Sequence, residues 1–395
     1  MSELIYRRES VHRNILRNIK ASELSPRNKS LILKFNDELF SRGLSTARVT
    51  KYMCKLLKLA RWLRKDFADA NLHDIKRLVS KVERSSFVPF TKKEYKMCLK
   101  KLFQWMREMD EDYPPEVRWI KLGSVSGVTR KLPEDMITQE EVLRLINAAK
   151  TARDRAFVST LYESGCRIGE LLPLQIRRVQ FDSMGAQLRV DGKKGWRRIR
   201  VVSSVPYLTI WLNEHPLKDD PSAYLWIDNR GSLIRYNSSR MILNRLGRRA
   251  GVKKRLNPHN FRHSRATFLA NYLTEAQMKE YFGWTGASDM PAVYVHLSGR
   301  DVDKAILKLH GIELEGDKKE EKVLAPKQCP RCNTSNPASN KFCLLCGLPL
   351  DQKVATGVIR DSLARKEADG ILDKMLEDPQ FRQTFLDKAR ELIQA

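Results

Sequence analysis

Apolar residues recur at helical spacing through the first hundred or so positions of the chain. They follow one another three or four positions apart in three stretches, 31–39, 53–63 and 91–106. Such a period predicts helices that bury one face. An acidic run and the pair Pro114-Pro115 then interrupt the pattern, and prolines disfavour a continuing helix. We therefore expect a helical domain over residues 1–130.

The next region opens as helix and then changes period. Thr138 and Glu141 have the spacing of a capping box, in which each side chain accepts from the other residue's backbone N–H. Alternation of apolar and polar residues then predicts three short strands, around Val179–Phe181, Leu188–Val190 and Ile199–Val201. The helical pattern returns from Pro206, with Asn257-Pro258 as a helix start. Residues 131–312 are thus expected to form a second domain, and the fold class to be mainly α with a small antiparallel sheet (α+β).

The last part of the chain has a different character. Residues 313–327 are charged and poor in apolar residues, which is typical of a linker. Two pairs of cysteines with the spacing CxxC follow within 328–351, and four thiolates are the ligand set of structural zinc. We expect a zinc ribbon there rather than a redox dithiol, followed by an amphipathic helix over 352–395. The predicted zinc ligands are Cys329, Cys332, Cys343 and Cys346.

The charge distribution changes the picture most. The formal net charge is +26, which favours polyanionic partners. Residues 1–130 hold 29 Lys and Arg against 15 Asp and Glu, residues 131–312 hold 30 against 18, and residues 313–395 hold 14 of each kind. Two domains that face nucleic acid, followed by a tail with another task, fit this distribution. A basic surface that only confers solubility is the plainer alternative.

Two further expectations concern the spacing of basic residues and the length of apolar runs. A run of basic residues at one-turn intervals predicts a positive stripe along a helix that follows a phosphate backbone, although a solvated face has the same pattern. This stripe consists of Lys51, Lys55, Lys58, Arg61, Arg64 and Lys65. No apolar run reaches the length of a membrane span, and the N-terminus lacks the features of a secretory signal. We therefore expect a cytoplasmic protein with reduced thiols and no membrane partner.

Four segments of the second region carry residues suited to phosphoryl chemistry. They are Gly165-Cys-Arg-Ile-Gly-Glu170, Gly192-Lys-Lys-Gly195, His259-Asn-Phe-Arg-His263, and Gly283-Trp284 ahead of Tyr294. In this order and combination they resemble the tyrosine recombinase (phage integrase) family. The resemblance covers about 134–312, and the preceding basic helical region resembles that family's core-binding domain.

The resemblance implies a set of catalytic residues. Carried over by position, they are Arg167, Lys193, His259, Arg262, Trp284 and Tyr294. Lys194 is an alternative to Lys193, one position away. Trp284 departs from the histidine more usual there, and its indole N–H donates a hydrogen bond but transfers no proton. Acid–base work then falls to Lys193 and His259.

These residue types suit attack on a phosphodiester. Arg167 and Arg262 offer forked, permanently charged donors to the non-bridging oxygens. Tyr294 is the nucleophile, and because an ordinary tyrosine has a pKa near 10, it needs a base such as His259 or nearby positive charge. The resemblance assigns protonation of the leaving 5′-oxygen to Lys193. Glu170 would orient an arginine. A phosphotyrosyl bond conserves the phosphodiester energy, so neither a nucleotide cofactor nor a catalytic metal is implied.

The sequence thus predicts a site-specific recombinase or integrase that cuts and rejoins double-stranded DNA through a 3′-phosphotyrosyl intermediate. Four strand cuts imply a homotetramer on DNA, with the C-terminal helix as a candidate for holding subunits together. The zinc ribbon beside a minimal core resembles archaeal members of the family. Two alternatives stay open at this point: strand relaxation of the type IB topoisomerase or telomere resolvase kind, and a DNA-binding regulator without catalysis.

Overall fold

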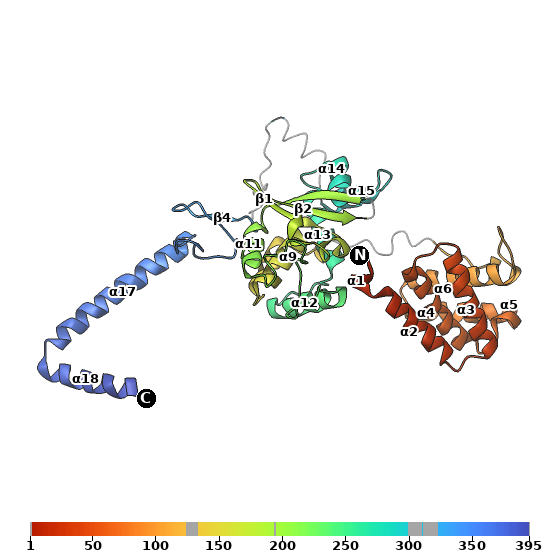
Figure 1. The fold of residues 1–395 in the computed structure, drawn as a ribbon, viewed down its shortest axis with the longest axis horizontal. Helices are drawn as coiled ribbons and strands as arrows, with labels where there is room; N and C mark the ends of the chain where they lie inside the picture. The colour runs from red at the N-terminus through yellow and green to blue at the C-terminus, as the bar shows by residue number, and fades with distance from the viewer. Residues whose placement is uncertain (1, 124–132, 193–194, 299–309, 311–322, 395) are drawn as a thin grey trace. The chain divides into compact units, whose positions relative to one another are not determined.

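The chain is mainly helical, with two small antiparallel sheets (Figure 1), and this confirms the predicted fold class. The computed structural model describes residues 2–123, 133–192, 195–298, 310 and 323–394. The chain divides into two units, one of Met1–Asp135 with Ile227–Ser239 and the other of Met136–Trp226 with Arg240–Ala395. Among the described residues, no helix is both long and apolar enough to cross a membrane.

Helices that bury the apolar positions seen in the sequence build the first unit. Phe35, Met53 and Leu102 are buried in one continuous core. Local signals set the helix starts: the Ser25 hydroxyl accepts from the Asn28 backbone N–H at 3.0 Å, and Pro26 occupies the first turn. The helices are α1 (Ser2–Tyr6), α2 (Arg8–Lys20), α3 (Pro26–Ser41), α4 (Thr46–Leu63), α5 (Leu72–Glu83), α6 (Pro89–Met106) and α7 (Pro115–Arg118).

Helices also make up most of the second unit, and its first start signal is confirmed. Thr138 and Glu141 form the predicted capping box, with bonds of 3.3 Å and 2.9 Å between each side chain and the other's backbone N–H. The predicted cap at Asn257 is also present. The helices are α8 (Gln139–Asn147), α9 (Ala152–Ser164), α10 (Ile168–Leu171), α11 (Val205–Glu214), α12 (Tyr236–Ala250), α13 (Pro258–Leu269), α14 (Glu275–Phe282) and α15 (Met290–Ser298).

The three predicted strands form one antiparallel sheet in the order β1 (Val179–Asp182), β2 (Gly185–Gly192), β3 (Gly195–Val201). Leu188 and Val190 are buried while Arg189 between them is exposed, as the alternation predicts. Helices α9 and α14 contact β3. The sheet therefore presents one apolar face to helices and one strongly basic face outward.

The tail begins with a two-stranded ribbon, β4 (Lys327–Gln328) and β5 (Ser335–Asn336). The single helix expected over 352–395 is two helices, α17 (Gln352–Leu376) and α18 (Pro379–Gln394). Asp378 accepts hydrogen bonds from the backbone N–H groups of Gln380 and Phe381, at 2.7 Å and 3.1 Å. Asp378-Pro379 is thus a new helix start that the apolar period concealed. Every side chain of α17 is at least partly exposed.

Candidate active site

A buried carboxylate, Glu170 in α10, holds the first predicted arginine. Its Oε1 accepts from Arg167 Nη1 at 3.0 Å, and its Oε2 accepts from the Arg167 backbone N–H at 2.9 Å. Arg197 of β3 donates from Nη2 to the same Oε2 at 2.7 Å. Burial opposes ionisation of Glu170, but the bonds and charges of Arg197 and Arg167 outweigh it and lower its pKa. The ionised carboxylate therefore fixes two guanidinium groups.

Arg262, in the first half of α13, is 3% exposed. Its Nη1 donates to the Gly165 carbonyl at 2.9 Å and its Nη2 to the Phe282 carbonyl at 2.6 Å. Burial, and then the charge of Arg167, lower its pKa to about 10, so it is still a cation at neutral pH. Gly165 has φ 54°, and a Cβ there would lie 2.6 Å from the Phe282 ring. Only glycine fits this position, so residue 165 helps to place Arg262.

Tyr294 lies in α15 and is 2% exposed. Its ring is parallel to that of Trp284, with centroids 5.5 Å apart and planes at 4°. Its hydroxyl is hydrogen-bonded to Nδ1 of His263. Burial raises the pKa of Tyr294 to about 12, despite the opposing charge of Arg262. The phenol is therefore protonated at neutral pH, and it contacts an imidazole nitrogen that accepts its proton in the tautomer with Nδ1 unprotonated.

Three other predicted site residues adjoin Tyr294 or its neighbour: Trp284 stacks on its ring, the charge of Arg262 acts on its hydroxyl, and His259 contacts His263. His263, which bonds the hydroxyl itself, is a residue that the sequence did not indicate. His263 follows Arg262 and lies one turn from His259, which is exposed. The two imidazole rings lie edge to face, with their centroids 4.2 Å apart. His259, His263 and Tyr294 therefore form a row of contacting side chains that begins at the exposed His259 and leads inward. The spacing of four residues between the histidines was the available signal.

Two other outcomes concern lysine and arginine. Lys193 and its alternative Lys194 lie outside the described residues. Arg197, three residues further on, was not singled out by sequence, yet it shares Glu170 with Arg167. No local pattern marks it, because its partner is 27 residues away. Chemically, the assembled groups offer fixed cations, a neutral tyrosine and an imidazole, a combination suited to attack on a phosphate ester.

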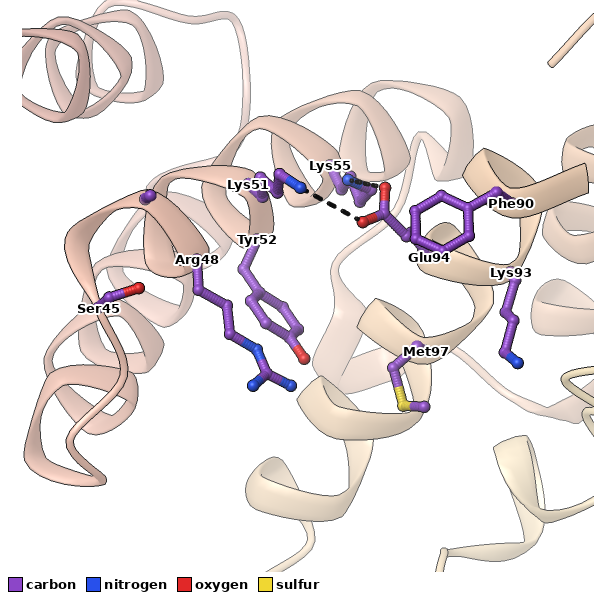
Figure 2. Close-up of a pocket in the computed structure, with 10 residues that line it drawn as sticks. Ser45, Arg48, Lys51, Tyr52, Lys55, Phe90, Lys93, Glu94 and Met97 are labelled. Atoms are coloured by element: carbon purple, nitrogen blue, oxygen red, sulfur yellow. Dashed lines mark ion pairs between the residues drawn. The ribbon is translucent and has the colours of Figure 1, made fainter. Parts of the chain in front are cut away.

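The first unit has a basic pocket between the start of α4 and α6, here called the α4–α6 pocket (Figure 2). Its volume is about 480 Å³. Figure 2 shows Glu94 facing two lysines, with its oxygens 3.7 Å from Lys51 Nζ and 3.1 Å from Lys55 Nζ. The remaining lining combines cations with apolar side chains: Arg48, Lys93, Tyr52, Phe90 and Met97.

The predicted positive stripe is partly neutralised and not continuous. Lys58 covers the rings of Trp62 and Phe87, at 5.1 Å and 4.5 Å from their centroids. Arg64 ends α4 in the left-handed conformation, and Lys65 beyond it pairs with Asp74 at 2.9 Å. Of the two lysines that face Glu94, Lys51 remains at the surface with 65% of its side chain exposed, whereas Lys55 is largely buried.

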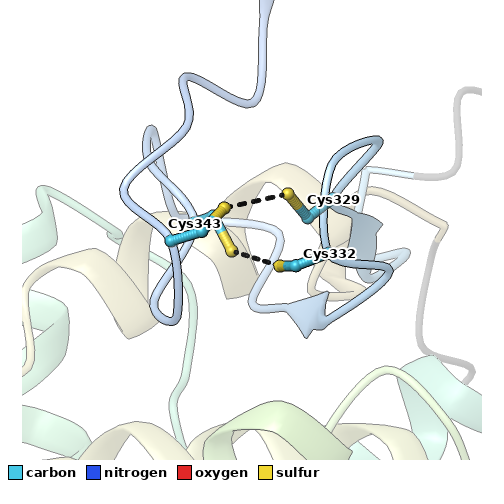
Figure 3. A group of neighbouring side chains, drawn as sticks. Cys329, Cys332 and Cys343 are labelled. Atoms are coloured by element: carbon cyan, nitrogen blue, oxygen red, sulfur yellow. Dashed lines mark hydrogen bonds between the residues drawn. The ribbon is translucent and has the colours of Figure 1, made fainter.

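The four predicted zinc ligands converge in the ribbon, and Figure 3 labels three of them, Cys329, Cys332 and Cys343. Cys329 Sγ lies 3.5 Å from Cys346 Sγ, Cys332 Sγ lies 3.5 Å from Cys343 Sγ, and all four sulfurs are within 4.8 Å of one another. Tetrahedral zinc with bonds of about 2.3 Å separates its sulfurs by about 3.8 Å, so the cluster could hold such an ion. The backbone N–H of Cys346 lowers the pKa of the Cys343 thiol to about 6, against a smaller effect of burial, which favours the thiolate that metals bind.

Within the second unit, the ribbon contacts α11 through a tyrosine of that helix. The buried Tyr207 hydroxyl donates to Ser339 Oγ at 3.0 Å and accepts from the Ser339 backbone N–H at 3.3 Å. Between the cysteine pairs, Asn336 donates to Cys343 Sγ at 3.6 Å and accepts from the Leu344 backbone N–H at 2.8 Å. A metal in this cluster would therefore be supported by the same loop that contacts α11.

Comparison with known proteins agrees with this geometry. Residues 135–300 match the model described as "Phage integrase family". This stretch contains every residue of the candidate active site, from Arg167 to Tyr294. Among curated relatives, "Tyrosine recombinase XerA" of Pyrococcus furiosus is 29% identical over 196 residues, covering 47% of this chain and 65% of its own. "Tyrosine recombinase XerC" of Haemophilus ducreyi is 29% identical over 204 residues, covering 49% and 66%. Over just under half of its length this chain is thus similar to Xer tyrosine recombinases, and it spans just under two thirds of these relatives.

Solved structures of the same class share the fold. XerH recombinase in a post-cleavage complex with palindromic difH substrate has a TM-score of 0.53 and 20% identity, covering 76% of this chain and 95% of that one. A lambda integrase dimer bound to a COC′ core site has a TM-score of 0.54 and 16% identity, covering 69% and 78%.

Proposed function

We propose that this protein is a site-specific DNA recombinase that cuts and rejoins duplex DNA through a 3′-phosphotyrosyl intermediate. The contact between Tyr294 and His263, beside the buried Arg262, carries this proposal. A protonated tyrosine buried against an imidazole and a guanidinium is a costly arrangement for packing alone. It is well suited to a nucleophile that must lose its proton only when an anionic substrate is in place.

In this mechanism the tyrosine oxygen attacks phosphorus, and the bond from phosphorus to the 5′-oxygen breaks. Arg167 and Arg262 stabilise the two negative non-bridging oxygens of the transition state. Arg262 uses two donors on carbonyls, which leaves three of its five N–H groups for substrate. Glu170 keeps Arg167 oriented without reacting. In the reverse step, the 5′-hydroxyl of a partner strand attacks the phosphotyrosine and regenerates the tyrosine.

Two protons move in each step. The Tyr294 proton passes to His263 Nδ1. His259 contacts the His263 ring on the side toward solvent. The departing 5′-oxygen takes a proton from Lys193 and leaves as an alcohol, which lowers the barrier because an alkoxide is a poor leaving group. Trp284 supports the tyrosine ring by stacking. The phosphodiester energy is retained in the phosphotyrosyl bond, so the reaction consumes no nucleotide cofactor and uses no catalytic metal.

We propose that duplex DNA is the partner and that four copies assemble for a complete exchange. Structural neighbours support this proposal, since they include XerH with difH substrate and a lambda integrase tetramer bound to a Holliday junction. In the first unit, the cations of the α4–α6 pocket would contact the duplex. The exposed apolar side chains of α17 and α18, such as Ile359, Leu363 and Phe385, are the proposed subunit contacts.

A structural zinc ion in the cysteine cluster completes the proposal. Cys329, Cys332, Cys343 and Cys346 would hold it with no open coordination position. Its role is to stabilise the ribbon and, through Ser339 and Tyr207, the position of the ribbon on α11. Four reduced thiols imply a reducing compartment, which agrees with the predicted cytoplasmic location. Metal analysis of the purified protein tests this part, and Cys332→Ser should lower the bound zinc.

The decisive experiment traps the covalent intermediate. A library of nicked duplexes lets the cleaved end diffuse away, so a reactive enzyme is left attached to DNA after denaturation. We expect an adduct with the native protein and none with Tyr294→Phe. Tyr272→Phe changes a 57% exposed tyrosine of the same unit and is the matched control, which should leave the adduct unchanged.

The variants also separate the alternatives. Joining of two marked duplexes indicates recombination, whereas rejoining within one duplex indicates strand relaxation. An adduct that survives Tyr294→Phe would disprove the nucleophile, and DNA binding without any adduct would favour a regulator. His263→Ala tests the proton route: its rate of adduct formation should fall about 100-fold, with the rate recovering as pH rises toward the tyrosine pKa of about 12.

A further inference from the structure

The second unit contains a basic cavity that the proposed chemistry does not use. It lies at the outward face of the sheet and has a volume of about 640 Å³. Its lining, here called the arginine groove, consists of Arg177, Arg178, Arg189, Trp196, Arg197 and Arg198. Five guanidinium groups thus converge on one cavity, and no acidic residue among those that the structure describes is part of the lining.

Two arginines of the groove have no carboxylate partner among the described residues. Arg189 on β2 stands directly opposite Arg198 on β3, and like charges in this position destabilise a sheet. In the described part of the chain, neither forms an ion pair with a carboxylate. Two residues further along β3, by contrast, Arg200 forms an ion pair with Asp182 at 2.6 Å. The sheet therefore neutralises one outward arginine and leaves its neighbours charged toward solvent.

An aromatic ring forms part of the same surface. The Arg178 guanidinium carbon lies 4.1 Å from the centroid of the Trp196 ring, which holds this cation in place without neutralising it. Trp196 is 58% exposed, so a large apolar ring is left beside the arginines of the groove. Guanidinium groups gathered around an exposed aromatic ring are a feature of surfaces that bind nucleic acid strands.

The inner end of the groove is linked to the candidate active site. Arg197 lines the groove, and its Nη2 contacts Glu170 Oε2 at 2.7 Å. The other oxygen of Glu170 contacts Arg167 Nη1 at 3.0 Å. One carboxylate thus separates the groove from the arginine proposed to bind the scissile phosphate. A strand whose scissile phosphate is at Arg167 would therefore pass the inner end of the groove at Arg197.

We infer that the arginine groove binds the phosphodiester backbone of the DNA strand next to the scissile phosphate. This inference rests on the proposed function, because it assumes that DNA is the substrate of the adjacent site. Arg189, Arg198 and Arg178 make contacts that position the strand and read no sequence. The mutual repulsion of Arg189 and Arg198 is relieved when phosphates enter between them.

The test measures the salt dependence of binding to a fluorescent DNA duplex between about 50 and 200 mM salt. Removal of one arginine–phosphate contact should reduce the slope of log K against log salt by about 0.9. The double variant Arg189→Ala/Arg198→Ala should therefore have a slope shallower by about 1.8 and, at about 0.15 M salt, an affinity lower by about fivefold for each arginine removed. Arg200→Ala is the matched control on the same strand and should keep the native slope.

Stability measurements complete the test. Because the double variant removes a repulsive pair, its thermal midpoint should not fall below that of the native protein. Arg178→Ala carries the same binding test independently, should the double variant misfold. Native slopes in these variants, or an equal reduction in Arg200→Ala, would overturn the inference. The proposed function is tested by a different result, the Tyr294-dependent adduct of the native protein. That result does not depend on the groove variants.

Discussion

The two basic cavities of this protein balance their charge in different ways. The α4–α6 pocket surrounds Glu94 with Lys51 and Lys55, so the protein itself neutralises part of that surface. Within the described ranges, the arginine groove has no carboxylate in its lining, and only Arg197, at its inner end, forms an ion pair with an acidic residue. The first cavity is therefore compensated before any ligand arrives, and the second is not.

This difference matters for what each cavity can recognise. Glu94 is half-buried between the two lysines, and its carboxylate repels phosphate, so the α4–α6 pocket attracts a phosphodiester backbone less strongly than its lysines alone would. Uncompensated arginines attract any phosphodiester backbone regardless of sequence. Lysine on a flexible stem can also leave Glu94 easily, whereas a forked guanidinium keeps its geometry. The contrast is testable by adding or removing single carboxylates.

The largest effect is expected from Glu170→Gln, because Glu170 neutralises the inner end of the arginine groove through its ion pair with Arg197. Glu170→Gln would leave Arg167 and Arg197 without their shared anion, and removing one partner of a buried ion pair costs about 3 kcal/mol of unfolding free energy. Because the pKa of Glu170 is lowered from 4.5, this stabilisation is complete above that pH and is lost as pH falls through the lower, folded-state value. Urea unfolding of both proteins at neutral and acid pH measures the difference.

The control for that measurement is Glu214→Gln, which removes an exposed carboxylate from the end of α11. It should change the unfolding free energy very little at either pH. If Glu170→Gln were as stable as the native protein at neutral pH, the carboxylate would not hold the two arginines. The link between the groove and the active site would then be wrong.

A smaller effect is expected from Glu94→Gln, which would make the α4–α6 pocket resemble the groove. Lys51 and Lys55 would become free to contact phosphate, so DNA affinity should rise and the salt slope should steepen by about 0.9 per freed cation. Lys51 is exposed, but the Lys55 and Glu94 side chains are only 13% and 29% exposed, so removal of the carboxylate should cost about 1 kcal/mol of stability.

Glu83→Gln provides the matched comparison for Glu94→Gln. It makes the same change in charge and frees Lys96, which it contacts at 2.8 Å, but neither residue lines the pocket. Fluorescence anisotropy with the same duplex should show no steepening of the slope for this variant. Equal effects from the two substitutions would mean that net charge alone, not the pocket, determines binding.

The smallest effect is expected at the outward face of the sheet. Asp182→Asn removes the partner of Arg200 and extends the uncompensated arginines by one residue. The salt slope should increase by less than one full contact, because Arg200 lies beyond the groove lining. A decrease in DNA affinity would contradict this expectation, since it would mean that Asp182 itself supports binding. Anisotropy titrations on Asp182→Asn and the native protein provide the comparison.

Much of the fold could be predicted because its signals are local. The capping box of Thr138 and Glu141, the start of α13 at Asn257, and the alternation in β2 each depend on residues only a few positions apart. The cysteine cluster could also be predicted from the sequence, because two CxxC spacings indicate four metal ligands. The break between α17 and α18 was equally local, at Asp378-Pro379, but a helical period on both sides of it obscured the signal.

The amino-acid sequence by itself determined which residue types are present for phosphoryl chemistry, where helices and strands begin, and that the charge favours a polyanion. Only the tertiary structure decided which of these groups meet. His263 and Tyr294 are 31 residues apart, and Arg197 and Glu170 are 27 apart. Likewise, the exposed arginines of the groove are distinguished from Arg200 only by the position of Asp182 across the sheet. Periodicity reports which face of an element is buried, whereas charge balance depends on distances in space.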